Sequence, residues 1–465
     1  MAYLGKKGYT VFKKDLSSSQ IAKIRDELTV KPHTTHGQEP SYPIYLESDR
    51  KFYLPRYYGI EELGKVEMNL SPGQTIDLPF TGSLFPYQEK IIDTYLSYVG
   101  KSGGGLLDVE PGKGKTVMAL NIISKIQRKT LVIVHKSFLM NQWEERINTF
   151  LPNAKVGKIQ GDCIDIEGKD IVLGMLQSLS SKVYPEDMWD SFGLCVFDEC
   201  HHLSAEVFSK VMTKIVTPYT LGLSGTMTRK DGLTKVFKYF IGPVVHKEKS
   251  DLTTEVHVKT VFLQNDVLFD GVKTDFKGSP LYSCLVTRLD HAGRNAILLE
   301  VLKEELRKQP DQQIMILAHT KSLLAHLFEG VQQFETSVGY YLGGMKEAAL
   351  KEAETKKIIL GTYAMASEGL DIKTLTTLFM VTPKSDICQS VGRILRSKEH
   401  SPLVVDFVDE QDMFLSQYKK RLQYYQSKFF KIEEFETFQA YQEDRSTFKK
   451  PKAKKGQVKA CQVIL

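Results

Sequence analysis

From about Leu84 onward, short apolar runs alternate with amphipathic helical stretches, and this alternation constrains the fold more than any other feature. The run "GLLDVE" precedes the helix-like "KTVMALNIISKIQ", and "TLVIVHK" precedes "SFLMNQWEERINTF". The pattern starts again later with "QIMILAHT", "KIILGTY" and "PLVVDFVD". Near-continuous apolar strands with helices between them are typical of a parallel sheet covered on both faces. The sequence therefore predicts an α/β protein with two parallel-sheet domains in tandem.

The remaining segments differ from this pattern. Near the N-terminus, "SSSQIAKIRDEL" has the signals of a capped helix, and two strands are expected around a turn at Ser48 and Asp49, which suits a small α+β domain. After the first α/β domain, we expect a strand in "TTEVHVKTVFL" and then a loop or small insertion. The predicted organisation is an N-terminal accessory domain at 1–83, α/β domains at 84–245 and 246–430, and a C-terminal extension at 431–465.

The N-terminal segment mixes basic and aromatic side chains around its expected turn. The residues concerned are Arg50, Lys51, Tyr53, Arg56, Tyr57 and Tyr58. Such a mixture can hold a phosphate backbone and stack on bases. An ordinary hairpin with its aromatic rings packed inward has the same composition. Binding of DNA by this domain therefore stays one of two interpretations.

The charge of the chain is concentrated at its C-terminal end. The net charge is +6, yet the stretch 445–465 holds seven Lys or Arg residues and no Asp or Glu, so the rest of the chain sums to about −1. This tail, expected to lack regular structure, could attract nucleic acid without reading sequence, or could only aid solubility. No signal peptide or apolar run of membrane-spanning length is recognised, and the six cysteines form no CxxC pair. We therefore expect a soluble, intracellular protein without a disulfide framework or zinc finger.

A strand, a glycine-rich turn and a helix follow one another in "LLDVEPGKGKTVMAL". The core of a phosphate-binding loop is matched by Gly112, Gly114, Lys115 and Thr116. Glycines let backbone N–H groups approach phosphate oxygens, and the helix N-terminus favours an anion through its dipole. Lys115 is then placed to reach the β- and γ-phosphates, and the Thr116 hydroxyl to bind Mg²⁺. Val109 stands where the full motif has its first glycine.

Further along, the apolar run "LCVFDE" ends in two carboxylates, Asp198 and Glu199. In nucleotide motors, the carboxylate at the end of such a strand holds Mg²⁺, and the next one positions or deprotonates the attacking water. A zinc site at Cys200, His201 and His202 is the alternative. Adjacent residues at a strand end point in different directions and no second ligand pair stands nearby, so phosphoryl transfer is favoured over zinc binding.

Together these residues resemble the motifs of superfamily-2 helicases of the DExH-box type. "DECH" is a form of the DExH box, "LFPYQ" resembles the segment before the phosphate loop, and "LVIVHKSFLMNQW" resembles the motif after the second strand, with His135 and Lys136 in place of the more usual Pro-Thr. "LSGTMTRKDG" resembles the Ser-Ala-Thr motif, with Gly225 in place of Ala. "GTYAMASEGLDI" resembles the fifth motif, and "QSVGRILR" matches the sixth, Q-x-x-G-R-x-x-R, completely. The resemblance covers roughly 84–410.

Among these helicases, the compact layout is most similar to that of large DNA viruses and phages, namely poxvirus-type transcription helicases and phage branch-migration helicases. The resemblance implies two tandem RecA-like parallel-sheet domains with a small N-terminal α+β domain. It also implies ATP and Mg²⁺ as cofactors. The first domain would bind ATP, and the second would supply arginines to the γ-phosphate, so that hydrolysis depends on closure of the two domains.

The resemblance also implies roles for individual residues. Catalytic roles fall to Lys115, Asp198, Glu199, Gln389, Arg393 and Arg396. The nucleotide would be bound by Gln88, Gly112, Lys113, Gly114, Lys115, Thr116, Gly369 and Asp371. Mg²⁺ would be held by Thr116 and Asp198. The nucleic-acid backbone would be contacted around Lys136, Ser178, Thr320 and Thr362, although hydroxyls at strand ends often only cap the next helix. Nucleotide state would be coupled to the bound strand through His201, Ser224 and Thr226.

The implied activity is that of an ATP-dependent DNA helicase or translocase, of 3'-5' polarity, that unwinds or remodels duplex or branched DNA. The implied partners are single-stranded, duplex or branched DNA, an RNA–DNA hybrid, and proteins of replication, recombination or transcription. A monomer that acts where viral or phage DNA is processed, away from membranes, fits this picture. Three alternatives remain: a motor that acts on RNA–DNA hybrids and releases transcripts, the motor subunit of a restriction system, and a catalytically silent nucleic-acid-binding protein. The last is disfavoured because the loop lysine, both carboxylates and both arginines are present.

Overall fold

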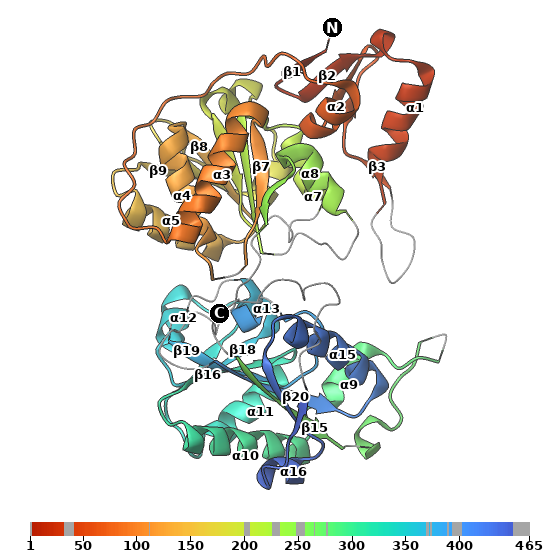
Figure 1. The fold of residues 1–465 in the computed structure, drawn as a ribbon, viewed down its shortest axis with the longest axis vertical. Helices are drawn as coiled ribbons and strands as arrows, with labels where there is room; N and C mark the ends of the chain where they lie inside the picture. The colour runs from red at the N-terminus through yellow and green to blue at the C-terminus, as the bar shows by residue number, and fades with distance from the viewer. Residues whose placement is uncertain are drawn as a thin grey trace, which may run out of the picture. The chain divides into compact units, whose positions relative to one another are not determined.

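The computed structural model describes residues 2–31, 41–110, 112–199, 205–225, 233–247, 256–264, 266–275, 278–368, 372, 374–387, 390–392 and 402–449. The chain forms two compact units, Met1–Lys249 and Ser250–Leu465, each with its own hydrophobic core (Figure 1). Among the described residues, we find no helix with both the length and the apolar character needed to cross a bilayer.

The first unit begins with a small α+β domain. Its antiparallel sheet has the order β1-β2-β6-β5, and its elements are β1 (Tyr3–Gly5), β2 (Gly8–Phe12), η1 (Lys13–Asp15), α1 (Ser18–Glu27), β3 (Thr29–Val30), β4 (Tyr42–Pro43), β5 (Leu46–Glu47), β6 (Lys51–Leu54) and α2 (Arg56–Leu63). Ser17 and Gln20 form a reciprocal capping box at the start of α1, as the sequence predicts. The expected hairpin is also present as β5 and β6.

Two of the basic and aromatic residues of this domain are buried. Arg56 and Tyr58 lie on α2 and are buried, so the packing interpretation is confirmed for these two side chains. The guanidinium of Arg56 donates to the carbonyls of Pro218 and Ser102, and the ring of Tyr58 contacts that of Tyr239 edge-on. The small domain therefore packs directly against the rest of the first unit, and its core is continuous with one face of the following sheet.

The larger part of the first unit is a sheet with the order β10-β9-β11-β8-β12-β13-β7-β14, in which β10 alone of the described strands is antiparallel to its neighbour. The strands are β7 (Gly104–Asp108), β8 (Thr130–Val134), β9 (Val156–Gln160), β10 (Cys163–Ile164), β11 (Ile171–Met175), β12 (Leu194–Phe197), β13 (Tyr219–Ser224) and β14 (Val244–Lys247). The predicted parallel sheet is confirmed.

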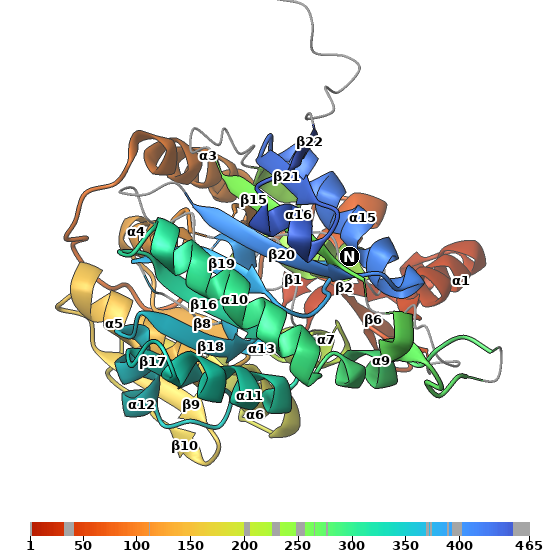
Figure 2. The same ribbon diagram turned by 90° about the horizontal axis from the view of Figure 1, so that it is seen from below.

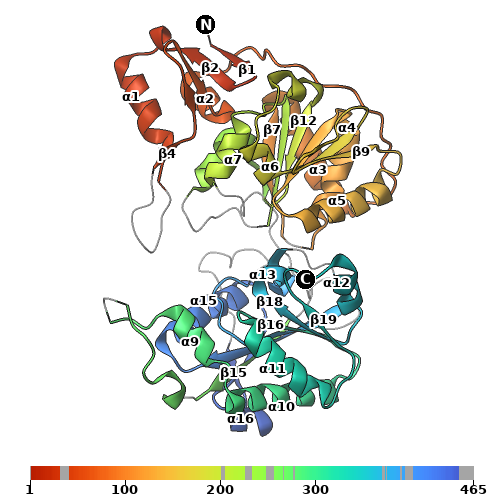
Figure 3. The same cartoon turned by 180° about the vertical axis from the view of Figure 1, so that it is seen from behind.

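Helices cover both faces of this sheet (Figure 3). The helical elements are α3 (Pro86–Ser102), α4 (Lys115–Ile126), α5 (Ser137–Phe150), α6 (Leu176–Ser181), η2 (Glu186–Ser191), α7 (Ala205–Met212) and α8 (Thr234–Ile241). Helices α3, α4 and α5 bury their apolar residues on one face, and α6, α7 and α8 on the other. Because both faces are covered, the central strands are apolar throughout, which explains their continuous hydrophobic runs.

The second unit repeats this architecture with the order β17-β18-β16-β19-β20-β15-β21-β22. Its strands are β15 (His257–Leu263), β16 (Gln313–Ala318), β17 (Val338–Tyr341), β18 (Ile358–Thr362), β19 (Leu375–Met380), β20 (Leu403–Asp409), β21 (Lys431–Phe435) and β22 (Thr447–Lys449). Its helical elements are η4 (Asp266–Phe269), α9 (Tyr282–Arg288), α10 (Ala292–Lys308), α11 (Lys321–Gln332), α12 (Glu347–Glu354), α13 (Tyr363–Glu368), α15 (Asp412–Ser427) and α16 (Phe438–Gln442). Figure 2 shows α10 and α11 together on one face of this sheet.

This sheet runs past residue 430, where the sequence had suggested that the second domain ends. Strand β21 pairs in parallel with β15, and β22 closes the edge in antiparallel orientation. The stretch Thr447–Lys449 thus belongs to the fold, whereas the sequence pattern of the basic tail had suggested no regular structure from Arg445 onward. A three-residue edge strand of mixed polarity carries too weak a pattern to be recognised from sequence.

Candidate functional site

The glycine-rich loop connects the carboxyl end of β7 to the first residue of α4, Lys115. Gly112 and Gly114 have φ values of 86° and 78°, which side chains with a Cβ rarely adopt. A Cβ on Gly114 would lie 2.4 Å from Nε2 of Gln88, so a larger residue here would push the Gln88 amide aside. The loop therefore leaves its backbone and the N-terminus of α4 open to an anion.

Two side chains at the start of α3 donate hydrogen bonds to a backbone carbonyl of the loop. Nε2 of Gln88 donates to the carbonyl of Lys113 at 3.0 Å, and the hydroxyl of Tyr87 donates to the same carbonyl at 3.1 Å. Oε1 of Gln88 accepts from the backbone N–H of Phe85. By resemblance, Gln88 was expected to bind the nucleotide. In the structure, both ends of its amide hold protein backbone, so the residue fixes the loop carbonyl as well as lying beside the site.

Lys115 and Glu199 form an ion pair across the site, with 2.7 Å between Nζ and Oε1. Lys115 is buried at 9% exposure, so solvent screens this pair only partly. Glu199 has a φ of 47°, in the left-handed region that is uncommon for residues other than glycine. This backbone conformation carries the second carboxylate to the loop lysine directly after β12.

Asp198 is buried directly after β12 and accepts a hydrogen bond from the indole N–H of Trp143, at 2.8 Å from Nε1 to Oδ2. Burial and the nearby Glu199 carboxylate raise the pKa of Asp198 to about 6, while the indole hydrogen bond opposes this rise. Trp143 lies on α5 and is itself buried. Reasoning from sequence did not assign Trp143 a role, although it ends the quoted run "LVIVHKSFLMNQW".

The residue types of the site fit a nucleotide with Mg²⁺. The Asp198 carboxylate and the Thr116 hydroxyl on the first turn of α4 supply hard oxygen donors, which Mg²⁺ prefers. The part of the chain that the structure describes contains no group of three or more His, Cys, Asp or Glu side chains able to hold a metal. The alternative zinc residues, Cys200, His201 and His202, lie outside the described residues.

The order of the strands brings other residues with predicted roles to the same edge of the sheet. Strands β8, β12, β13 and β7 are neighbours and parallel, so their carboxyl ends meet there. Ser224 is the last residue of β13 and is buried, and its backbone carbonyl accepts from the backbone N–H of Val109. Lys136 precedes α5 beyond the end of β8, and burial lowers its pKa. Four sequence motifs thus converge on one edge, as expected at the carboxyl ends of an α/β sheet.

The other candidates for nucleic-acid contact differ in their surroundings. Ser178 on α6 is buried, and its hydroxyl oxygen accepts from the N–H of Gly161, so it already has a structural partner. Thr320 lies after β16 and directly before α11, and Thr362 is the last residue of β18. The two strands are neighbours in the sheet, and Ala318 lies opposite Thr362. The Thr320 side chain makes no capping hydrogen bond to α11, so the capping explanation fails for it.

Several predicted residues cannot be placed. Outside the described residues lie His201, Thr226, Gly369, Asp371, Gln389, Arg393 and Arg396. Their roles stay predictions.

Two buried arginines hold the backbone that precedes the sixth motif. Arg294 binds both carboxylate oxygens of Asp409 and donates to the carbonyl of Val381 at 2.7 Å. Arg421 binds both oxygens of Asp406 and donates to the carbonyl of Lys384 at 2.8 Å. Both aspartates come from β20, which explains two acidic residues within the apolar run "PLVVDFVD".

Two family models match the chain. "Type III restriction enzyme, res subunit" covers residues 81–229, and "Helicase conserved C-terminal domain" covers residues 297–398. These matches fall on the two units described above.

Several curated proteins are similar over most of the chain. A "Putative ATP-dependent RNA helicase" of Acanthamoeba polyphaga mimivirus is 34% identical over 92% of this chain and 86% of its own length. A protein of the same description from African swine fever virus is 27% identical over 89% of this chain and 84% of its own. A "DNA 3'-5' translocase" of Sulfurisphaera tokodaii is 25% identical over 77% of this chain and 89% of its own length.

Proposed function

Because this chain is a superfamily-2 helicase, an ATP-dependent enzyme with viral relatives, we propose that it is a motor on DNA that unwinds or remodels duplex or branched molecules with 3'-5' polarity. The convergence of Lys115, Asp198 and Glu199 beside the glycine-rich loop carries this proposal. A relative named as a DNA 3'-5' translocase supports the choice of DNA and of polarity.

The loop residues would bind the triphosphate. Backbone N–H groups at Gly112, Lys113 and Gly114 and the N-terminus of α4 would hold its phosphates, with Gln88 and Tyr87 keeping the Lys113 carbonyl turned away from them. The Lys115 ammonium, now 2.7 Å from Glu199, would be drawn to the more highly charged phosphates. Binding would thereby release Glu199 from its ion pair.

Glu199 would then orient the attacking water and accept its proton. Asp198 and Thr116 would hold Mg²⁺, which when bound neutralises charge on the phosphate oxygens. Trp143 would keep the Asp198 carboxylate in one orientation. By family resemblance, we assign Gln389, Arg393 and Arg396 to the γ-phosphate, Gly369 and Asp371 to the ribose, and His201, Ser224 and Thr226 to coupling with the bound strand.

The test is a lysine-to-alanine comparison within one helix. Lys115→Ala should abolish DNA-stimulated ATP hydrolysis, whereas Lys125→Ala, in the last turn of α4, should leave it unchanged because Lys125 is exposed and forms a surface ion pair with Asp93. Hydrolysis of ATP at the wild-type rate by the Lys115 variant would refute the proposal. Absence of ATP hydrolysis in the wild type itself, with nucleic-acid binding retained, would support a catalytically silent binding protein.

A second candidate keeps the motor and changes its substrate. The viral relatives are named as RNA helicases, which favours action on RNA or on RNA–DNA hybrids, as in transcript release. Both substrates are held through the phosphate backbone, which carries no sequence information. Stimulation of ATP hydrolysis by single-stranded DNA, forked DNA, RNA and hybrid duplexes, each at saturation, would distinguish the two candidates.

A further inference from the structure

The N-terminal sheet has one face that the core does not use. Strand β2 turns Tyr9 and Val11 inward, where both are buried, so its alternate residues face the other way. The register places Tyr3 and Tyr53 opposite the same residue of β2, and Phe12 opposite Lys51. Three aromatic rings, those of Tyr3, Phe12 and Tyr53, therefore lie on this outer face, and none of them is fully buried.

Lysines lie over these rings. Nζ of Lys51 is 4.6 Å from the ring centre of Phe12 and 5.5 Å from that of Tyr3, and it donates to the Tyr3 hydroxyl. Nζ of Lys14 is 5.7 Å from the ring centre of Phe12. Within the described ranges, no carboxylate forms an ion pair with Lys14 or Lys51, so their charge on this face is not neutralised by a salt bridge.

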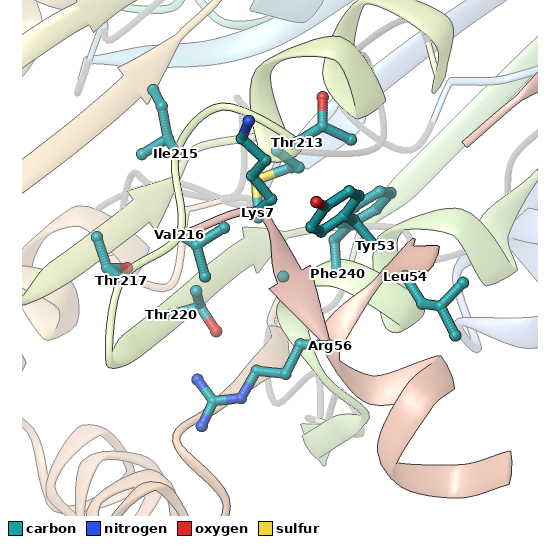
Figure 4. Close-up of a pocket in the computed structure, with 12 residues that line it drawn as sticks. Lys7, Tyr53, Leu54, Arg56, Thr213, Ile215, Val216, Thr217, Thr220 and Phe240 are labelled. Atoms are coloured by element: carbon teal, nitrogen blue, oxygen red, sulfur yellow. The ribbon is translucent and has the colours of Figure 1, made fainter. Parts of the chain in front are cut away.

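A pocket lies where this face meets the larger sheet of the same unit. It is a small cavity of about 20 Å³, room for about one water molecule, and is lined from the small domain by Lys7, Tyr53 and Arg56, and from the larger part by Met212, Ile215 and Phe240 among others. In Figure 4, Lys7 and Tyr53 lie on one side of the pocket and Arg56 on the opposite side. Nζ of Lys7 is 5.8 Å from the ring centre of Tyr53, so the pocket continues the aromatic and basic face.

Arg56 forms one wall of this cavity. It is 9% exposed, and its two terminal nitrogens bind the carbonyls of Pro218 and Ser102. Its guanidinium is therefore engaged by the protein backbone and is not part of the exposed basic face.

We propose that this outer face, formed by Tyr3, Phe12, Lys14, Lys51 and Tyr53, binds single-stranded nucleic acid. Phosphates lie against Lys14 and Lys51, and bases stack on the tyrosine and phenylalanine rings. Aromatic rings interleaved with cations give this kind of sequence-tolerant binding. The inference rests on the proposed motor function and adds a second, ATP-independent contact to the nucleic acid.

The experiment measures binding without ATP. The full-length protein is titrated against labelled oligo-dT and oligo-U by fluorescence anisotropy at several salt concentrations. Tyr53→Leu should weaken binding by about tenfold, since a stacked base is worth roughly 1–3 kcal/mol. Lys51→Gln should lower the slope of log K against log salt by about 0.7, the value for one phosphate contact on a single strand. Lys101→Gln, at an exposed lysine on α3 that is not one of the residues forming this face, is the matched control.

The outcomes separate this inference from the motor function. Loss of affinity in both face variants, with wild-type unfolding midpoints and an unchanged ATPase rate at saturating nucleic acid, supports it. Unchanged affinity in both, an equal loss in Lys101→Gln, or binding to duplex alone overturns it. Comparable affinity for oligo-dT and oligo-U indicates that the shared single-strand chemistry is recognised, and a strong preference for one identifies the natural strand. Absence of nucleic-acid-stimulated hydrolysis in the wild type would instead refute the motor, because binding is measured separately.

Discussion

The hydrogen bond from Trp143 to Asp198 leads to a quantitative prediction about Mg²⁺. The indole N–H donates to Oδ2 at 2.8 Å, and both residues are buried, so no water can replace the donor without rearrangement. A hydrogen bond to a charged group contributes roughly 1.5–3 kcal/mol. Partners of metal-binding side chains typically change metal affinity by about 10–100-fold when they are removed.

Trp143→Phe keeps an aromatic ring and removes the donor. We expect the Mg²⁺ concentration for half-maximal ATP hydrolysis to rise by at least about tenfold, because the freed carboxylate is both less well oriented and easier to protonate. At saturating Mg²⁺, the maximal rate should recover much of its wild-type value. Because the hydrogen bond lowers the pKa of Asp198, its loss should also shift the acidic limb of the pH–rate profile to higher pH.

The chain provides a matched control and a direct reporter. Its other tryptophan, Trp189, is also buried and packs against Tyr184 and Phe192. Trp189→Phe should leave the Mg²⁺ requirement unchanged, and in that variant all tryptophan emission comes from Trp143. Titration with Mg²⁺ and a non-hydrolysable ATP analogue should then change the emission without any turnover. An unchanged Mg²⁺ requirement in Trp143→Phe would refute the reasoning, as would an equal change in Trp189→Phe.

Three further predictions follow from the same structure. In the wild type, ATP hydrolysis should decline as the pH falls through about 6, since the raised pKa of Asp198 lets a proton compete with Mg²⁺, and a pH–rate profile at tenfold higher Mg²⁺ should show the decline at lower pH. Arg421→Leu should lower the free energy of unfolding by about 3–5 kcal/mol because it leaves the buried Asp406 carboxylate without its counter-ion, and chemical denaturation should show a smaller loss when Asp406→Leu is added. Gly114→Ala should sharply weaken nucleotide binding in equilibrium titrations while the circular dichroism spectrum is retained, because its φ of 78° strains an alanine.

Sequence patterns predicted the parts of the molecule that are determined by residues close together in the sequence. The phosphate loop depends on glycines, a lysine and a helix start within a few residues, and the structure shows Gly112 and Gly114 in the backbone conformation that this requires. The apolar strands were likewise recognisable, because burial on both faces makes each run hydrophobic in itself.

Contacts between distant residues were not predictable in this way. Trp143 and Asp198 are 55 positions apart, and Arg294 and Asp409 are 115 apart, so no periodicity or spacing connects either pair. The basic and aromatic hairpin shows the same limit. Its composition suited both burial and nucleic-acid contact. In the structure, Lys51 and Tyr53 lie on β6, whereas Arg56 begins α2 and is buried.

The two buried arginines suggest why the second unit places charges where apolar residues would pack more simply. Replacing a buried ion pair with apolar side chains often costs no stability, so the pairs of Asp406 and Asp409 are not explained by stability alone. Each guanidinium also binds a backbone carbonyl just after β19, at Val381 and at Lys384. An apolar substitute could fill the space but could not hold these carbonyls. The two guanidinium groups therefore fix the path of the backbone that leads into the sixth motif. This role depends on the direction of their hydrogen bonds to the carbonyls rather than on burial.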